Sequence, residues 1–167
     1  DRSLIARRDD YGWNALHFAG RSCCTEIAKT LLDANSSLAH EANSEGQTPL
    51  FMVAQAGHVS CTDIANHLLS FNAAVNQRDE QGAIPLMYAA GYGPADMVRT
   101  LLEADRSSAN ERDYAHQTAL MWAACKANYT SADDSLEALL AVMDSHLLNV
   151  RGGLRNDTAL CCSMRLL

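Results

Sequence analysis

Apolar residues recur along the chain in short segments that have the spacing of one face of a helix. Five such segments resemble one another around a central leucine, and small or apolar residues follow that leucine three and four positions later in the first four. The central leucines are Leu16, Leu50, Leu86, Leu120 and Leu160, at separations of 34, 36, 34 and 40 residues. Self-similarity at a nearly constant period is typical of repeat proteins, in which each unit packs on the next. The pattern therefore predicts a repeated unit with an unfinished fifth copy.

A second apolar stretch follows each of the first four segments. These stretches occupy residues 27–32, 64–69, 97–102 and 136–140, and in the first three the apolar residues stand at positions i, i+4 and i+5. That spacing marks the buried face of a helix. Each repeat is therefore expected to hold two short helices.

The ends of these helices are marked by residues with known local preferences. Thr48 and Thr118 can accept a backbone N–H at a helix start, and Pro49 and Pro85 suit the first helical turn. Between the repeats lie Asn/Asp-x-x-Gly sequences at 43–46 and 79–82, in which glycine can take a positive φ. Before the fourth repeat His116 replaces that glycine. The sequence thus predicts helix pairs joined by tight turns.

The Thr-Pro-Leu-x-x-Ala-Ala pattern, the second Leu-Leu helix and the Asp-x-x-Gly turn together closely resemble the ankyrin repeat. The Asn-Ala-Ala-Val-Asn segment at 72–76 is also similar to the Gly-Ala-Asp-Val-Asn link of that family. The resemblance covers nearly the whole chain. It implies an all-α solenoid of stacked helix-turn-helix units with short β-hairpin-like turns, a concave groove, and function by protein binding.

On this basis we expect residues 1–167 to form a single ankyrin-repeat domain. The expected repeats cover about 10–42, 43–78, 79–112 and 113–154, with a partial repeat at 155–167. The chain begins without Met and stops inside an apolar motif, so we expect it to be a fragment of a larger protein. The last motif lacks its second helix, and we expect it to fray or to be covered by another chain or domain.

Two insertions depart from the family pattern, near residues 57–61 and within 126–134. The link at 144–156 after the fourth repeat is also long. Solenoids tolerate insertions on one face, and this is one interpretation of all three segments. The other is that these loops contact a partner, since loops often carry function.

Large apolar groups stand two positions after each of the first four central leucines, at Phe18, Met52, Tyr88 and Trp122. Because a helix turns about 100° per residue, these side chains point away from the leucine. Tyr92 and Lys126 lie on nearly the same face one turn later, and Lys126 is placed to cover the Trp122 ring. The resemblance implies that this face looks into the groove, as an exposed ladder for a partner. The alternative is that these residues pack between adjacent repeats as core.

The turn tips offer a second candidate surface. The flanking residues are Tyr11, Trp13, Glu45, Gln47, Glu80, Gln81, Tyr114 and Gln117. They suit a partner with basic or mixed polar groups, although charged tips are also ordinary solenoid surface. The residues expected to bind a partner are Trp13, Phe18, Gln47, Met52, Tyr88, Tyr92, Tyr114, Trp122 and Lys126.

Composition and charge narrow the range of partners. Hydrophobic residues make up 48% of the 167 residues, and 13 Lys plus Arg against 20 Asp plus Glu give a net charge of −7. A chain with this negative charge is a poor ligand for the phosphate backbone of nucleic acids. We therefore expect no nucleic acid partner. No apolar run is long enough to span a bilayer, and we expect no membrane partner. Six cysteines without a CxxC motif are expected to be reduced thiols, in the cytoplasm or nucleus.

The residues that carry chemistry in other proteins have structural explanations here. His17 sits where the family's Thr-Pro-Leu-His pattern places a histidine that bonds neighbouring backbone. The spacing of His58, Cys61 and His67 is not a zinc pattern, and no catalytic motif occurs. We therefore expect no enzyme activity, no metal and no cofactor. The expected function is a scaffold or adaptor that binds a protein partner. The alternative is a regulatory or substrate-docking segment of a larger multidomain enzyme, such as a kinase, with contacts to other domains of the same chain.

Overall fold

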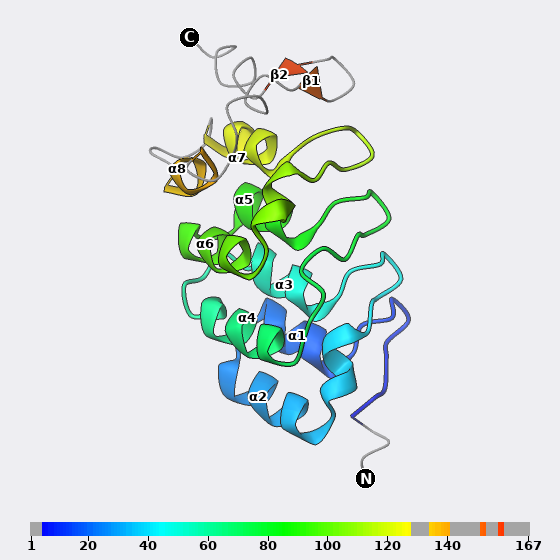
Figure 1. The fold of residues 1–167 in the computed structure, drawn as a ribbon. Coiled ribbons are helices and arrows are strands. Elements are labelled where there is room, and N and C mark those ends of the chain that lie inside the picture. The colour runs from blue at the N-terminus through cyan, green and yellow to red at the C-terminus, as the bar shows by residue number, and fades with distance from the viewer. Residues whose placement is uncertain (1–4, 128–133, 141–150, 153–156, 159–167) are drawn as a thin grey trace.

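The computed structural model describes residues 5–127, 134–140, 151–152 and 157–158. Within them the chain forms helices in consecutive pairs that stack along one axis, with the N-terminus at one end of the stack (Figure 1). The pairs are α1 (Ala15–Arg21) with α2 (Thr25–Ala34), α3 (Pro49–Gln55) with α4 (Cys61–Ser70), α5 (Pro85–Tyr92) with α6 (Ala95–Ala104), and α7 (Ala119–Ala127) with α8 (Asp134–Leu140). The expected all-α solenoid of helix pairs is confirmed.

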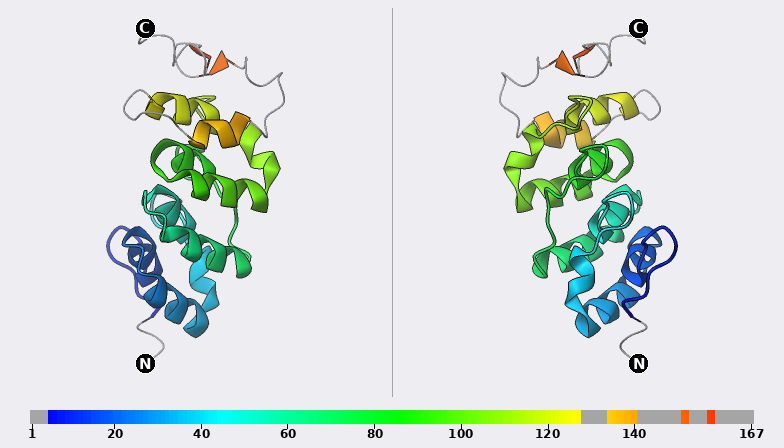
Figure 2. Two further views of the ribbon diagram at one scale, coloured as in Figure 1. Left: turned by 90° about the vertical axis from the view of Figure 1, so that its left-hand side faces the viewer. Right: turned by 90° about the vertical axis from the view of Figure 1, so that its right-hand side faces the viewer.

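The helices form two layers. The inner helices α1, α3, α5 and α7 pack on one another in chain order, and the outer helices α2, α4, α6 and α8 do the same. Figure 2 shows from two sides that the pairs follow one another in chain order along the stack. The four central leucines within the described residues face this core: Leu16, Leu50 and Leu86 are fully buried and Leu120 is 2% exposed. In the fourth pair Leu139 is buried and Leu140 is 42% exposed, so Leu139 takes the core position of the outer helix.

The helix starts agree with the sequence in part. Pro49 and Pro85 are the first residues of α3 and α5, where no helical N–H bond is lost. Asn14 caps α1, because its Oδ1 accepts the backbone N–H of Leu16 at 3.0 Å and of His17 at 3.1 Å. Thr118 Oγ1 accepts the N–H of Met121 at 3.4 Å. The expectation for Thr48 is wrong, since its side chain makes no capping bond.

Two 3-10 turns extend the outer layer and lie outside the expected helix pairs. They are η2 (Ser36–His40), after α2, and η3 (Arg106–Asn110), after α6. Each begins at a residue whose side chain accepts an N–H two positions on, Asn35 for Ser37 and Asp105 for Ser107. Repeats one and three therefore share a linker that repeat two, with the Asn-Ala-Ala-Val-Asn segment, does not have.

The turns between pairs project from one side of the stack as hairpin-like tips (right-hand side of Figure 1). Each tip is closed by a backbone bond four positions long, as from the Asp79 N–H to the Ala83 carbonyl at 3.0 Å. Neighbouring tips are also bonded to each other. The backbone N–H of Ser44 donates to the Tyr11 carbonyl at 3.0 Å. In the same way the N–H of Glu80 donates to the Glu45 carbonyl at 2.9 Å, and that of Tyr114 to the Gln81 carbonyl at 3.0 Å. The tips thus form a continuous edge.

The expected glycine conformations are present in the tips. Gly46 and Gly82 have φ of 78° and 74°, values that favour glycine. His116, which replaces glycine in the fourth tip, is forced to the same region at φ 60°. The fourth tip therefore keeps the turn geometry with an unfavourable residue.

The structure places one of the two insertions. Five residues separate the end of α3 at Gln55 from the start of α4 at Cys61, whereas two separate α5 from α6. This loop leaves α3 at the end away from its tip, and Val59 within it is 63% exposed. Most of the second insertion, the long link and the fifth motif lie outside the described residues. In the described part of that region, β1 (Arg151–Gly152) and β2 (Asp157–Thr158) form a short antiparallel pair.

Candidate functional site

The inner helices and tips of the first three repeats enclose an open cavity of about 550 Å³. We call this cavity the groove pocket. It is lined by Trp13, Arg21, Glu45, Gln47, Met52, Gln55, Ala56 and Tyr88. Apolar surface thus lies beside one cation, one carboxylate and two amides. The lining is mainly polar, and a concave site with convergent polar groups beside an aromatic ring is a candidate binding site.

Tyr88 is fixed at the floor of the groove pocket by a buried polar network. Its hydroxyl donates to Asp79 Oδ2 at 2.7 Å and accepts from Gln47 Nε2 at 3.0 Å. The Phe51 ring packs against it edge-on, with centroids 5.5 Å apart. Burial, together with the Asp79 carboxylate, holds the pKa of Tyr88 well above its usual range. The hydroxyl is therefore a neutral donor locked to the third tip.

The fourth repeat builds the same relationship from different residues. Trp122 Nε1 donates to Asp113 Oδ2 at 3.1 Å, over the same separation of nine residues as Tyr88 and Asp79. The Tyr88 and Trp122 rings lie 5.3 Å apart, and Tyr92 lies 6.2 Å from Trp122. These three rings form an aromatic cluster across α5 and α7.

Oδ1 of the turn aspartate or asparagine organises the tip. Asp79 Oδ1 accepts the N–H groups of Gln81 and Ala83, both at 2.9 Å. Asn43 Oδ1 does the same for Glu45 and Gln47, at 3.0 and 2.9 Å. One turn residue therefore sets the tip conformation and, in repeats three and four, also holds the groove aromatic.

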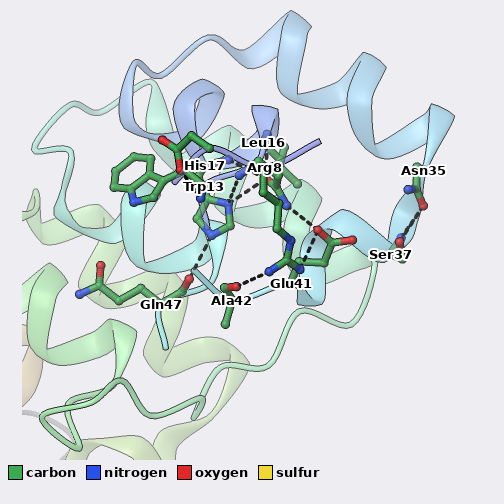
Figure 3. Close-up of polar contacts among 11 residues, drawn as sticks. Arg8, Trp13, Leu16, His17, Asn35, Ser37, Glu41, Ala42 and Gln47 are labelled. Carbon is green, nitrogen blue, oxygen red and sulfur yellow. Dashed lines mark hydrogen bonds and ion pairs between the residues drawn. The ribbon is translucent and has the colours of Figure 1, made fainter. Parts of the chain in front are cut away.

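In the first repeat, His17 connects two repeats. It is fully buried; Nε2 donates to the Gln47 carbonyl at 3.0 Å and Nδ1 accepts the Asn14 N–H at 3.3 Å. Burial lowers the pKa of His17, so the ring is neutral in this position. The expected structural role of His17 is confirmed. In Figure 3 the Trp13 and Gln47 side chains lie on one side of His17, and Arg8 and Glu41 lie on the other.

Arg8 and Glu41 form a clamp between the first two repeats. Arg8 Nη2 lies 3.1 Å from Glu41 Oε2, and Arg8 Nη1 donates to the Ala42 carbonyl at 2.9 Å. Arg78, directly before the third tip, pairs in the same way with Glu111 and donates to the Arg112 carbonyl, directly before the fourth tip. Ala42 stands at the equivalent place directly before the second tip and has no such side chain. There the Tyr88 network joins the repeats instead.

The comparisons with known proteins agree with this architecture. The family model described as "Ankyrin repeats (3 copies)" matches residues 35–113 and 60–151, well over half of the chain. The chain belongs to the ankyrin repeat family. Ankyrin repeats are a protein-interaction module, so a protein partner is implied.

Ankyrin relatives come from several kinds of protein. The chain is 36% identical over 91 residues to Tyrosine-protein kinase Shark of Drosophila melanogaster, covering 54% of this chain and 9% of that protein. It is 33% identical over 89 residues to Ankyrin repeat domain-containing protein 53 of Mus musculus, covering 51% and 17%. It is 40% identical over 99 residues to E3 ubiquitin-protein ligase XBAT33 of Arabidopsis thaliana, covering 58% and 18%. The chain thus spans less than a fifth of each of these relatives.

The groove pocket and the aromatic cluster bring together several of the expected binding residues. Trp13, Gln47, Met52 and Tyr88 line the groove pocket. Tyr92 and Trp122 join the aromatic cluster, and Tyr114 stands at the fourth tip, 71% exposed. Lys126 belongs to α7, but its side chain lies outside the described residues. Whether these residues bind a partner stays a prediction.

The expected exposed ladder differs from the structure at its middle positions. Phe18 is 50% exposed, whereas Met52 is 3% and Tyr88 8% exposed. The reason is position in the stack: α3 and α5 have an inner helix on each side, whereas α1 has one only on the side of α3. Met52 and Tyr88 thus pack between repeats, as the alternative interpretation expected.

The sequence did not single out Arg21. Its guanidinium lies over the Trp13 ring, 5.6 Å from the centroid. Trp13 precedes α1 and Arg21 ends it, so their contact depends on how the first tip folds back over the helix. The spacing of residues within a single helix does not predict this contact.

The cysteines require a correction. Cys23 and Cys61 form a disulfide with Cα atoms 5.0 Å apart, so the expectation that all thiols are reduced is wrong for this pair. The two residues are 38 positions apart and meet because the loop after α1 lies against the start of α4 in the next repeat. Cys24 and Cys125 are free. The placement in cytoplasm or nucleus loses the support that it drew from these two thiols.

Two further findings concern metals and membranes. Among the residues that the structure describes, no group of three or more His, Cys, Asp or Glu side chains is arranged to hold a metal ion. None of the described helices is both long and apolar enough to cross a membrane.

Proposed function

We propose that this chain is a scaffold or adaptor that holds a protein partner across the groove pocket and the tips, and that residues 1–167 act as one binding domain. The distribution of exposed aromatic side chains carries the proposal. Among the residues that the structure describes, the four exposed aromatic side chains all lie on the tips or the inner helices. They are Tyr11, Phe18, Tyr92 and Tyr114, with exposures of 73%, 50%, 56% and 71%.

Physical chemistry favours this surface as a contact. Tyrosine and phenylalanine are enriched where proteins meet, because they bury a large area at a small cost in side-chain entropy. The tips are rigid, since backbone bonds join each tip to the next. A rigid edge loses little freedom when a partner binds. The acidic charge of the chain also disfavours a nucleic acid partner. We propose no catalytic activity.

Site-directed photo-crosslinking tests this proposal. A photoreactive residue placed at Tyr92 or Tyr114 should join the chain to a discrete partner in a cell extract. The matched controls are Ile27, 55% exposed on α2, and Val59, 63% exposed in the loop before α4. Crosslinks to the same protein of equal yield from all four positions, or only from the controls, would contradict a groove and tip site.

A second candidate function comes from one relative. The chain matches a segment of a tyrosine kinase, 9% of that protein, so repeats of this kind do occur beside a kinase domain. In that setting the groove would dock a substrate or another domain of its own chain. Sequencing the transcript on both sides of the coding segment would decide, because a catalytic domain in the same open reading frame favours this function and its absence favours the adaptor.

A further inference from the structure

We infer that the groove pocket takes an arginine or lysine side chain from an extended basic segment of the partner protein. The inference rests on the proposed function, because it names the chemistry of the partner at that surface. Three observations carry it. They are the chain's own Arg21 over the Trp13 ring at one wall of the pocket, an unpaired carboxylate in the pocket, and the charge of the tips.

The first observation is that the pocket already accommodates a guanidinium. Arg21, itself a lining residue, lies over the Trp13 ring at 5.6 Å. A cation over an aromatic face is attracted by the negative charge of the ring face, and tryptophan is the best such face. The chain's own arginine therefore shows that this wall suits a planar cation.

The second observation is that Glu45 faces the pocket with no counterion. It lines the cavity, and its charge contributes to raising the pKa of Tyr88. Among the described residues its carboxylate forms no ion pair or side-chain hydrogen bond, although Arg8, Lys29, Arg78 and Arg99 all have acidic partners. An open carboxylate in the same cavity as the Trp13 ring and Met52 suits a side chain with an apolar stem and a cationic end.

Gln47 adds an acceptor. Its amide nitrogen donates to Tyr88 and, at 3.5 Å, to Asp79, which fixes the orientation of the amide. Its amide oxygen accepts no hydrogen bond from the described residues. Gln55 is an exposed lining residue and offers a second amide. Arginine has five N–H donors, so carboxylate and amide oxygens together can satisfy several of them.

The third observation concerns the tips around the pocket. The four tip sequences, at 9–12, 43–46, 79–82 and 113–116, contain six Asp or Glu residues and no Lys or Arg. Asp10, Glu45 and Glu80 are exposed, and the whole chain has a net charge of −7. Such an edge attracts basic segments and repels acidic ones. The pocket binds one basic side chain, and the acidic edge favours further basic residues along the segment.

A random-peptide library displayed on phage and selected on the 167-residue chain tests the inference. Selected peptides should be enriched in arginine or lysine beside an apolar residue. Binding of the corresponding synthetic peptides should weaken about tenfold or more in the Glu45→Gln variant. The matched control is Glu103→Gln, an exposed carboxylate on α6, which should leave binding unchanged. Replacing the arginine of the peptide by neutral citrulline should weaken binding equally.

Arg21 gives an independent readout. Arg21→Gln removes a positive charge and uncovers the Trp13 ring, so it should tighten binding of the basic peptides several-fold. Weaker binding in this variant would overturn the inference, because Arg21 would then be a contact for an acidic group.

The outcomes separate this inference from the proposed function. Peptides without basic residues that still bind, and that photoreactive groups at Tyr92 or Tyr114 capture, would leave the groove as a binding surface and overturn the basic-segment inference. Selected peptides that crosslink only from Ile27 or Val59 would overturn both. Basic peptides that bind Glu45→Gln and Glu103→Gln equally would overturn the role of the pocket.

Discussion

The carboxylate of Asp79 accepts a hydrogen bond at 2.7 Å from the hydroxyl of Tyr88, nine residues further along the chain. Asp113 and Trp122 repeat this relationship at 3.1 Å with an indole N–H as the donor. In both repeats the residue that shapes the tip also holds the aromatic side chain of the inner helix. The tips and the groove are therefore mechanically one surface in repeats three and four.

The Tyr88 hydroxyl is expected to contribute to stability. Tyr88→Phe would leave the buried Asp79 Oδ2 with one long bond from Gln47, and an unsatisfied buried acceptor costs about 1–3 kcal/mol. Urea unfolding should show a loss of this size. Tyr114→Phe is the control, because Tyr114 is 71% exposed and its substitution should change the free energy of unfolding by less than about 0.5 kcal/mol. Equal effects of the two variants would contradict the network.

Much of the fold follows from the sequence because it depends on local rules. The period of the leucines, the prolines at Pro49 and Pro85 and the turn glycines each act over a few residues. The helix pairs could therefore be predicted, and so could the backbone bond made by His17. That Thr48 makes no capping bond could not be predicted, since nothing in its local sequence tells whether its hydroxyl reaches a backbone N–H.

The candidate site depends on longer distances and was predicted less completely. Phe18 and Met52 occupy the same place in their repeats, and only the stack makes one exposed and the other buried. The Arg21 contact with Trp13 and the Cys23–Cys61 bond likewise join segments that no sequence period relates. The chemistry of the tips, in contrast, could be seen in the sequence as tyrosines and carboxylates.

Stability should fall in mild acid through His17. Burial lowers its folded pKa, so the unfolded chain binds the proton first and the contribution is complete above the unfolded value of about 6.5. Below that pH it is lost with a slope of up to about 1.4 kcal/mol per pH unit, until the folded pKa is reached. Unfolding free energies between neutral and mildly acidic pH should show this slope in the native chain and not in His17→Gln. His40→Gln, at an exposed histidine, should keep it.

The Cys23–Cys61 disulfide should stabilise the first two repeats. A crosslink across 38 residues removes freedom from the unfolded chain, and its loss should cost about 2–4 kcal/mol. Thermal unfolding with and without a reducing agent measures this. Cys24→Ser is the control, since Cys24 is free and the variant should respond to the reducing agent as the native chain does. Alkylation of both Cys23 and Cys61 in the unreduced, denatured protein would show that the bond is absent.

Glycine at position 116 should stabilise the fourth tip. His116 has φ 60°, a conformation that costs a residue other than glycine about 1–3 kcal/mol. Glycine adds about 0.5–1 kcal/mol of unfolded-chain entropy, so His116→Gly should raise the free energy of unfolding by up to roughly 2.5 kcal/mol. Replacing a turn glycine tests the same preference of glycine for positive φ. At Gly82, with φ 74°, a Cβ would lie 2.6 Å from Tyr114 Cδ1, so Gly82→Ala should lower the melting temperature. A loss of stability in His116→Gly would mean that the histidine side chain stabilises the tip.

The equivalent residues Phe18 and Met52 should respond differently to truncation. Met52 is 3% exposed between repeats, so Met52→Ala should leave a cavity and cost about 2–5 kcal/mol. Phe18 is 50% exposed and packs on Trp13 at a centroid distance of 5.1 Å, so Phe18→Ala should cost less than about 1 kcal/mol. Phe18→Ala should also weaken peptide binding at a temperature where the variant is folded, because an exposed ring beside Trp13 is lost. If Phe18→Ala lowers stability as much as Met52→Ala and leaves binding intact, Phe18 is core as well, and the contact surface is reduced to the tips and Tyr92.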